Sequence, residues 1–173
     1  MLEFKKKLNT VFTNYSIDYA CFRDKINSNQ KELALVFVEI CKIYEIKNII
    51  INGDIDLALE CGANGVHLRG NQLNLIKSVN ELGLKSIYSS HSLEDIINAK
   101  NEGVYAVTMS PIFDSLKGKG IGLEALKEIL NSVDMNVFAL GGITKDWQVE
   151  ELKKLPLTVL LLLDILLNNI KKD

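Results

Sequence analysis

Polar side chains that could do chemistry follow two apolar runs near the middle of the chain. Ser89 and His91 come directly after the first run, and Ser110 comes directly after a second run that begins at Val104. Residues 93–101 repeat apolar side chains at helical spacing, which predicts a strand, a helix and a second strand. Because ligands bind at the carboxyl ends of parallel strands, we expect His91 to be an acid/base group and Ser89 and Ser110 to contact a ligand.

Length and charge limit the class of protein. The 173 residues, 47% of them hydrophobic, fit one domain over residues 1–173. The formal net charge of −2 gives no basic excess, so we expect neither a nucleic acid nor an anionic membrane as a partner. A small anionic metabolite needs only a local group of hydrogen-bond donors, and this class of ligand is not excluded.

The cysteines and the apolar segments predict a cytoplasmic protein. Three cysteines lie about twenty residues apart, without the close pairs of a zinc site, and indicate free thiols in a reducing compartment: Cys21, Cys41 and Cys61. The N-terminus lacks the apolar segment of a secretory signal. The apolar run over residues 157–167 is too short to span a bilayer.

Apolar segments alternate with helical patterns along the chain. Seven short strands are expected, near residues 18, 48, 65, 85, 104, 136 and 157. The helices between them include Leu33–Tyr44, with Ile43 on its buried side, and residues 93–101, with Ile97 on its buried side. Strands that are apolar on both faces predict an α/β fold with a parallel sheet covered by helices. Their number predicts a (βα)8 TIM barrel that lacks one strand.

Six motifs extend this interpretation. They are Ile50–Ala58, Gly62–Leu68, Ser89–Glu94, Ser110–Phe113, Gly122–Leu126 and Ala139–Ile143. Through these motifs and their order, over roughly residues 20 to 145, the chain resembles the thiamine phosphate synthase and TenI (thiazole tautomerase) family of (βα)8 barrels. The resemblance places Cys21–Lys25 at the end of the family's second strand. It therefore implies that the first strand is absent and that residues 1–14 are its remaining helix.

A barrel without one strand has two open sheet edges, and their backbone groups need hydrogen-bond partners. We expect the N-terminal segment or another subunit to cover these edges. The second alternative predicts a homodimer or another oligomer.

The resemblance also assigns residues to a ligand. It implies that basic groups bind the pyrophosphate of a pyrimidine substrate and that a polar loop closes over it. The ligand-binding residues that it implies are Arg23, Lys25, Asn52, Ser89, Ser110, Ser115, Lys117 and Lys119. Gly141 and Gly142 end a predicted strand, where glycines let backbone N–H groups approach a phosphate closely. The resemblance implies that this phosphate belongs to a phosphorylated thiazole.

Residues that the family uses for metal binding and proton transfer are replaced here. The resemblance places two Mg²⁺-binding aspartates at Gly53 and Gln72, with Asp54 one position after the first. We therefore expect no metal site and no cofactor, with Mg²⁺ needed only by a synthase. The histidine of the TenI branch falls at Pro111, and Leu163–Asp164 replace small residues at the phosphate site.

Three functions follow from the resemblance. The leading hypothesis is a TenI-like isomerase in thiamine biosynthesis, because Asn52–Gly53 resembles that branch. Such an isomerase aromatises a thiazole carboxylate phosphate tautomer by proton transfer, here through His91. The second is a thiamine phosphate synthase, a transferase that joins pyrimidine pyrophosphate and thiazole phosphate. The third is an inactive binding subunit, which the absent strand, Pro111 and Asp164 favour.

As an alternative to catalysis, His91 can help to cap the following helix through its neighbours Ser90 and Ser92. His67 lies inside an apolar strand and is predicted to be a core residue.

Overall fold

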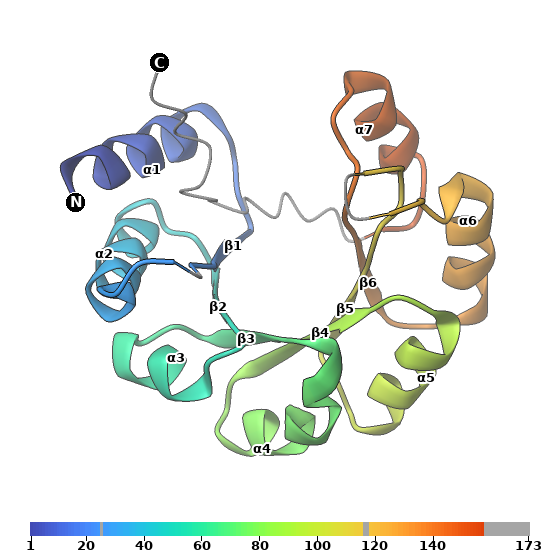
Figure 1. Ribbon diagram of the computed structural model, residues 1–173, viewed down its shortest axis with the longest axis horizontal. Coiled ribbons are helices and arrows are strands. Elements are labelled where there is room, and N and C mark those ends of the chain that lie inside the picture. Colours follow the sequence, from blue (N-terminus) through green and yellow to red (C-terminus); the bar gives the residue numbers. More distant parts are fainter. Residues whose placement is uncertain (25, 116–117, 158–173) are drawn as a thin grey trace. The chain divides into compact units, whose positions relative to one another are not determined.

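The protein alternates helices and strands in the computed structural model, which describes residues 1–24, 26–115 and 118–157 (Figure 1). The elements up to Leu68 are α1 (Leu2–Asn14), β1 (Tyr19–Phe22), α2 (Gln30–Ile43), β2 (Asn48–Asn52), α3 (Ile55–Cys61) and β3 (Gly65–Leu68). The elements that follow are a 3-10 helix η1 (Gly70–Leu75), α4 (Ile76–Glu81), β4 (Lys85–Ser90), α5 (Leu93–Asn101), β5 (Ala106–Met109), α6 (Gly122–Ser132), β6 (Asn136–Ala139) and α7 (Asp146–Lys153).

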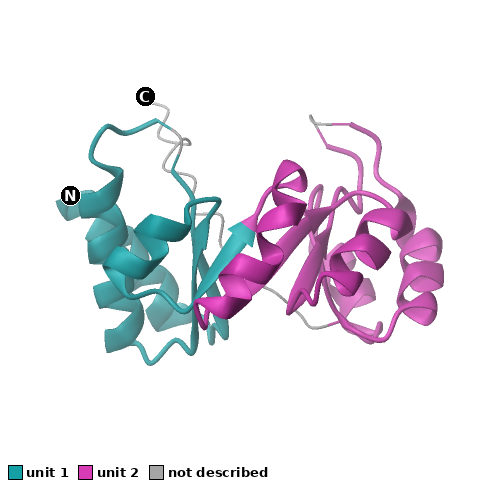
Figure 2. Cartoon of the chain, turned by 90° about the horizontal axis from the view of Figure 1, so that it is seen from below, with its two compact units in different colours: residues 1–67, 161–173 teal, residues 68–160 magenta. Residues whose placement is uncertain are grey.

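The chain divides into two compact units (Figure 2). Among the described residues, the first unit is Met1–His67 and the second begins at Leu68. Each unit contains parallel strands with helices between them. The expected single domain over residues 1–173 stays a prediction.

In the first unit, β1, β2 and β3 are parallel neighbours in this order. Cys21 lies opposite Ile50, and Ile51 lies opposite Val66. These four side chains are buried although neighbouring strand residues point to opposite faces, so both faces of the strands are covered. The helices of the unit lie on one side of its strands in Figure 1.

Helix α1 packs on α2 and β1 through aromatic side chains. The rings of Phe12 and Tyr44 meet edge to face with centroids 5.6 Å apart, and Thr13 Oγ1 lies 3.0 Å from the Tyr44 hydroxyl. Phe4 contacts Phe22 of β1 in the same way at 6.4 Å. Within the described residues 1–18 the chain forms this helix and no strand. The predicted N-terminal helix is therefore present, and its assignment as the remaining helix of an absent first strand stays a prediction.

In the second unit, β4, β5 and β6 are parallel neighbours in this order. Ile87 lies opposite Ala106, and Val107 lies opposite Val137. Ile96 of α5 and Leu126 of α6 are fully buried in this unit. Here too the helices lie on one side of the strands (Figure 1). Ser89 and Ser90 are thus the last residues of β4, with His91 after them, and Ser110 directly follows β5.

Six of the seven predicted strands are present, and the seventh, from residue 157 on, lies outside the described residues apart from its first position. Two predicted burials are wrong. Ile43 is 69% exposed and Ile97 is 45% exposed. Successive helical residues are rotated by about 100°. Ile97 follows the buried Ile96 by one position, and Ile43 follows the buried Cys41 by two, so both isoleucines turn away from the buried face.

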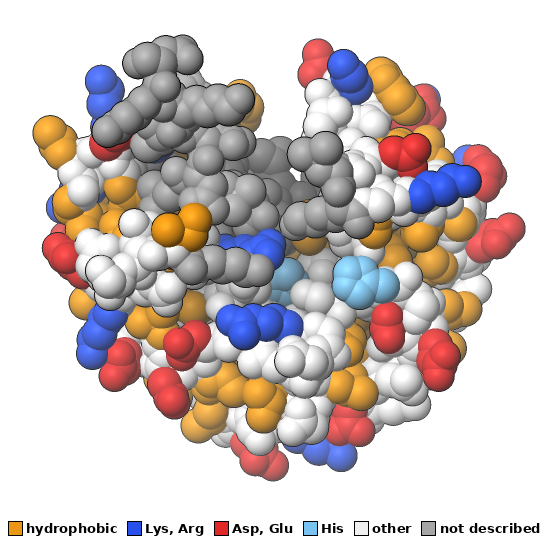
Figure 3. All heavy atoms as spheres, in the orientation of Figure 1, with side chains coloured by type: hydrophobic (Ala, Val, Ile, Leu, Met, Phe, Trp, Pro, Cys, Tyr) orange, Lys and Arg blue, Asp and Glu red, His pale blue; other side chains and the backbone are white. Residues whose placement is uncertain are grey.

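The thiols and the surface agree with the expectations from composition. All three cysteines are buried and free, and burial raises the pKa of Cys41 to about 12. Acidic and basic side chains are interspersed over the face seen in Figure 3. The ion pairs of the described residues include Lys31–Glu60, at 3.0 Å. None of the helices in the described part of the chain is long and apolar enough to cross a membrane.

Candidate functional site

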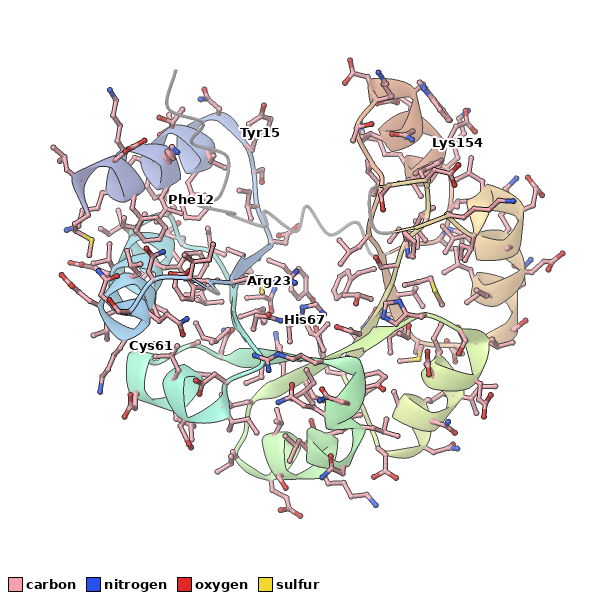
Figure 4. The ribbon with its side chains drawn as sticks, in the orientation of Figure 1. Phe12, Tyr15, Arg23, Cys61, His67 and Lys154 are labelled. Carbon is pink, nitrogen blue, oxygen red and sulfur yellow. The ribbon has the colours of Figure 1, made fainter. Side chains whose placement is uncertain are left out.

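The first unit gathers three polar side chains toward the carboxyl ends of its strands. Arg23 follows β1 directly, Asn52 is the last residue of β2, and His67 lies opposite Asn52 on β3. Asn52 Nδ2 lies 3.1 Å from the His67 carbonyl oxygen and 3.4 Å from His67 Nδ1. Arg23 and His67 both point away from the helices of the unit in Figure 4. The strands thus bring the predicted ligand-binding residues Arg23 and Asn52 together with His67.

His67 is a core residue, as predicted, and it is also part of this polar group. The residue is 7% exposed. Burial and, to a smaller extent, the positive charge of Arg23 lower the pKa of its imidazole to about 4. The imidazole is therefore neutral at neutral pH. It can accept a hydrogen bond through one ring nitrogen and donate one through the other.

The two residues after Asn52 turn the chain from β2 into α3. Gly53 has a φ of +72°, which glycine adopts without strain, and its N–H donates to the His67 carbonyl at 2.9 Å. Asp54 is the N-cap of α3, where its Oδ1 accepts a hydrogen bond from Leu57 N at 2.9 Å. The one carboxylate next to the family's metal-binding position is therefore committed to a helix cap.

Gln72, at the family's second metal-binding position, also has a structural role. Its Oε1 accepts a hydrogen bond from Arg69 N at 2.9 Å, at the start of η1. The part of the chain that the structure describes contains no group of three or more His, Cys, Asp or Glu residues that could hold a metal ion. Mg²⁺ needs several hard oxygen ligands, so the residues at these two positions do not fit it.

In the second unit, His91 joins the loops that follow β4 and β5. Its Nδ1 lies 2.6 Å from the Ser110 carbonyl oxygen. A carbonyl oxygen only accepts, so Nδ1 carries a proton, and Nε2 is the ring nitrogen that could exchange a proton with a ligand. The backbone N–H of His91 donates to Asp95 Oδ2 at 2.9 Å. His91 is exposed, so Nε2 is accessible to a ligand.

The serines of the two loops have different roles. Ser90 is fully buried, and its hydroxyl donates to the Thr108 carbonyl at 2.8 Å, which ties β4 to β5. Ser89 and Ser110 are half-buried. Ser110 Oγ lies beside Gly141, where it would be 2.8 Å from a Cβ atom at that glycine. Ser110 thus lies next to the predicted phosphate site, as its assignment requires.

Gly141 and Gly142 are needed for a close approach of two loops. Their φ angles are +84° and +74°, in the left-handed region that favours glycine. A Cβ at Gly141 would lie 2.8 Å from Pro111 Cα, and a Cβ at Gly142 would overlap the Phe113 carbonyl. Neither glycine N–H donates to an atom of the described residues. These two N–H groups, with Ser110 Oγ beside them, are donors that a phosphate could use.

The rest of the loop after β5, beyond Phe113, folds back on itself. Ser115 and Gly118 exchange two backbone hydrogen bonds of 3.0 Å each. Gly120 N donates to Asp114 Oδ1 at 2.8 Å, and Gly120 packs so closely on Phe113 that a Cβ there would overlap its backbone. Lys119 is exposed next to this turn. Gly120 therefore serves the compact packing of this loop, and the assignments of Ser115 and Lys119 stay predictions.

Known proteins show which family this geometry belongs to. The model of the thiamine monophosphate synthase family (TMP-TENI) matches residues 3–155 of the chain. The chain belongs to this family. Among its relatives, the thiamine-phosphate synthase of Clostridium acetobutylicum is 38% identical over 120 residues, which cover 66% of this chain and 56% of the relative. The thiamine-phosphate synthase of Clostridioides difficile is 35% identical over 138 residues, which cover 76% of this chain and 65% of the relative.

This member of the thiamine monophosphate synthase family thus spans between about half and two thirds of the length of those relatives. Thiamine phosphate pyrophosphorylase from Pyrococcus furiosus has the same fold, with a TM-score of 0.77 over 90% of this chain and 77% of that chain at 23% identity. The structure of a 3-hexulose-6-phosphate synthase matches with a TM-score of 0.64, over 91% of this chain and 83% of that chain, at 14% identity. The predicted family and the predicted barrel-type α/β fold are confirmed.

Several assigned residues of this family member stay predictions. Lys25 and Lys117 lie outside the described residues, as do Leu163 and Asp164. Sequence reasoning missed the role of Asp95, although the spacing Ser92-x-x-Asp95 is that of a capping box and could have indicated it. It also missed the cap formed by Gln72, which carries no comparable signal.

Proposed function

We propose that the chain acts in thiamine phosphate synthesis, binding thiazole phosphate at the carboxyl ends of β5 and β6 and joining it to a pyrimidine pyrophosphate. The observation that supports this proposal is the group of donors formed by Gly141 N, Gly142 N and Ser110 Oγ. The names of the relatives favour this reaction over the TenI-like isomerisation that Asn52–Gly53 suggests.

The donors of the second unit suit a phosphate for physical reasons. Two backbone N–H groups and one hydroxyl offer directed hydrogen bonds without a fixed counter-charge. The two glycines have no side chains of their own that could cover these N–H groups, and both have φ angles in the left-handed region. The phosphate then fixes one end of the thiazole and limits the orientations of its ring nitrogen.

The pyrophosphate of the second substrate needs positive charge when it leaves. Arg23 provides a guanidinium in the first unit, and a guanidinium binds phosphate oxygens in pairs. Mg²⁺ neutralises such a leaving group when it is bound, but Gly53 and Gln72 provide no carboxylate for it. We therefore assign no step to the metal and place pyrophosphate recognition on Arg23.

A second candidate function is favoured by His91. Its Nε2 could exchange a proton with a ligand on an exposed imidazole, while Nδ1 is held by the Ser110 carbonyl at 2.6 Å. A base fixed in this way can move a proton on a thiazole carboxylate phosphate tautomer without a metal. This isomerase would use the same phosphate site, so the two candidates differ in the second substrate and in His91.

Calorimetry with thiazole phosphate tests the shared part of the proposal. Wild type is expected to bind, and Ser110→Ala is expected to lower the affinity about 10-fold, since one hydrogen bond to a charged group contributes about 1.5 kcal/mol. Ser132→Ala removes an exposed hydroxyl on α6 and should leave the affinity unchanged. No binding by wild type, or equal affinity in Ser110→Ala, would contradict the phosphate site.

A further inference from the structure

The amide of Asn52 is oriented by a single partner. Its Nδ2 lies 3.1 Å from the carbonyl oxygen of His67 and 3.4 Å from Nδ1 of the same residue. A carbonyl oxygen cannot donate, so the atom that faces it must be the amide nitrogen and not the amide oxygen. The orientation of the Asn52 side chain is therefore fixed by chemistry.

The same contact fixes the tautomer of His67. The Asn52 amide nitrogen has two hydrogens, and one of them is directed at the His67 carbonyl. The amide nitrogen also lies 3.4 Å from Nδ1, and because an amide nitrogen only donates, a hydrogen bond between these atoms requires an unprotonated Nδ1. The proton of the neutral imidazole then sits on Nε2. The low pKa of His67, caused mainly by burial, keeps this acceptor available at neutral pH.

The amide oxygen of Asn52 is left to accept a hydrogen bond. None of the residues that the structure describes donates to Asn52 Oδ1. The side chain is half-buried at the carboxyl end of β2, on the strand next to Arg23. The amide nitrogen donates to His67, so Asn52 presents an acceptor and not a donor to a ligand.

We infer that His67 is a positioning residue that holds Asn52 with its amide oxygen toward a hydrogen-bond donor of the ligand. Asn52 and Arg23 then have complementary roles. The Arg23 guanidinium recognises the anionic part of the ligand, and the Asn52 amide oxygen recognises an N–H group. The choice of ligand rests on the proposed function. A pyrimidine that carries an amino group has such a donor, and thiamine phosphate contains one.

Two variants separate the positioning role from packing. His67→Asn keeps an acceptor near the place of Nδ1, whereas His67→Leu has a similar volume and no acceptor. Val66→Ala removes buried apolar atoms from the same strand without changing the Asn52 contact. The probes are thiamine phosphate and its analogue without the pyrimidine amino group. Wild type, His67→Asn and Val66→Ala are expected to prefer thiamine phosphate about 5- to 10-fold, and His67→Leu is expected to lose the preference.

Nitrogen NMR of the ligand-free protein tests the inference independently of the proposed function. We expect ring shifts of an imidazole that is protonated at Nε2 and unprotonated at Nδ1. A protonated Nδ1, or a preference kept in His67→Leu, would overturn the inference. If wild type binds neither probe, the proposed function and the ligand part of the inference both fail. The NMR tautomer then decides the positioning role alone.

Discussion

His91 Nδ1 lies 2.6 Å from the carbonyl oxygen of Ser110, so a side chain that follows β4 is hydrogen-bonded to the backbone that follows β5. This contact leaves Nε2 as the ring nitrogen that could exchange a proton with a ligand. It also holds the imidazole next to Ser110, whose hydroxyl lies beside Gly141. A base and a phosphate site therefore lie on neighbouring loops of the second unit.

Removing this imidazole tests the second candidate function. If the chain isomerises the thiazole tautomer, His91→Ala should lower the aromatisation rate about 10²- to 10⁴-fold, the usual contribution of a general acid or base. The affinity for thiazole phosphate should change little, because the phosphate donors remain. Ultraviolet absorbance follows the reaction. Equal rates in wild type and variant would exclude His91 as the acid/base group.

The loop that carries His91 depends on Asp95. Its Oδ2 accepts hydrogen bonds from His91 N at 2.9 Å and Ser92 N at 3.1 Å, and it completes the capping box of α5. Asp95→Ala should lower the free energy of unfolding by about 1 kcal/mol, the usual effect of a lost cap. Glu94→Ala, an exposed change in the same turn, should have little effect in urea unfolding. An unchanged free energy of unfolding in Asp95→Ala would show that the cap does not stabilise the loop.

A methyl group at Gly142 should destabilise the protein strongly. The new Cβ would overlap the Phe113 carbonyl, and the backbone has a φ of +74°. We expect Gly142→Ala to cost about 3 kcal/mol, from overpacking and backbone strain together. Gly83→Ala is a matched control with the same φ of +74° and no atom within 4 Å of the added Cβ. It should cost only about 1 kcal/mol in the same unfolding experiment.

If the two glycine variants lose equal stability, the close contact between Gly142 and the loop at Phe113 is not formed in solution. That result would also weaken the phosphate site, because the loop at Ser110–Phe113 holds its hydroxyl donor in place.

The buried imidazole of His67 should make stability depend on pH. Its pKa is 6.5 when unfolded and about 4 when folded, because burial and Arg23 disfavour the charged form. Between these values the unfolded chain binds the additional proton, so the free energy of unfolding falls as pH decreases from 6.5 toward 4. The total loss from this group is about 3 kcal/mol. Urea unfolding at several pH values should show that the free energy of unfolding falls with decreasing pH in wild type, and that it falls less steeply in His67→Asn.

The carboxylates titrate in the lower part of the same range in both proteins, so the difference between the two slopes is the relevant quantity. Parallel slopes would mean that the His67 imidazole is not buried as a neutral group.

The strands could be predicted from the sequence because short runs such as Ile49–Ile51 place apolar side chains on both faces of a strand. The family was predicted from the resemblance of six motifs and not from these runs. The sequence was not sufficient for single burials such as Ile97, where one position of helical rotation decides between core and solvent. The contact between Asn52 and His67 depends on the register of β2 and β3, which no local pattern specifies.

The glycines show a similar limit. Gly141 and Gly142 were predicted as a phosphate site, but their sequence does not reveal that Pro111 and Phe113 pack against them. Asp54 also could not be assigned from its position alone, since a carboxylate next to a metal-binding position and a helix cap have the same residue type. The hydrogen bond to Leu57 N identifies the cap.

The most direct test of the central proposal is formation of thiamine phosphate from pyrimidine pyrophosphate and thiazole phosphate, followed by fluorescence after oxidation and measured with and without Mg²⁺. The proposal predicts a product that depends on the protein and that decreases in Arg23→Ala and Ser110→Ala. Thiazole phosphate binding without any product would contradict synthesis and leave an isomerase or a binding subunit. Neither product nor binding would contradict the proposed function as a whole.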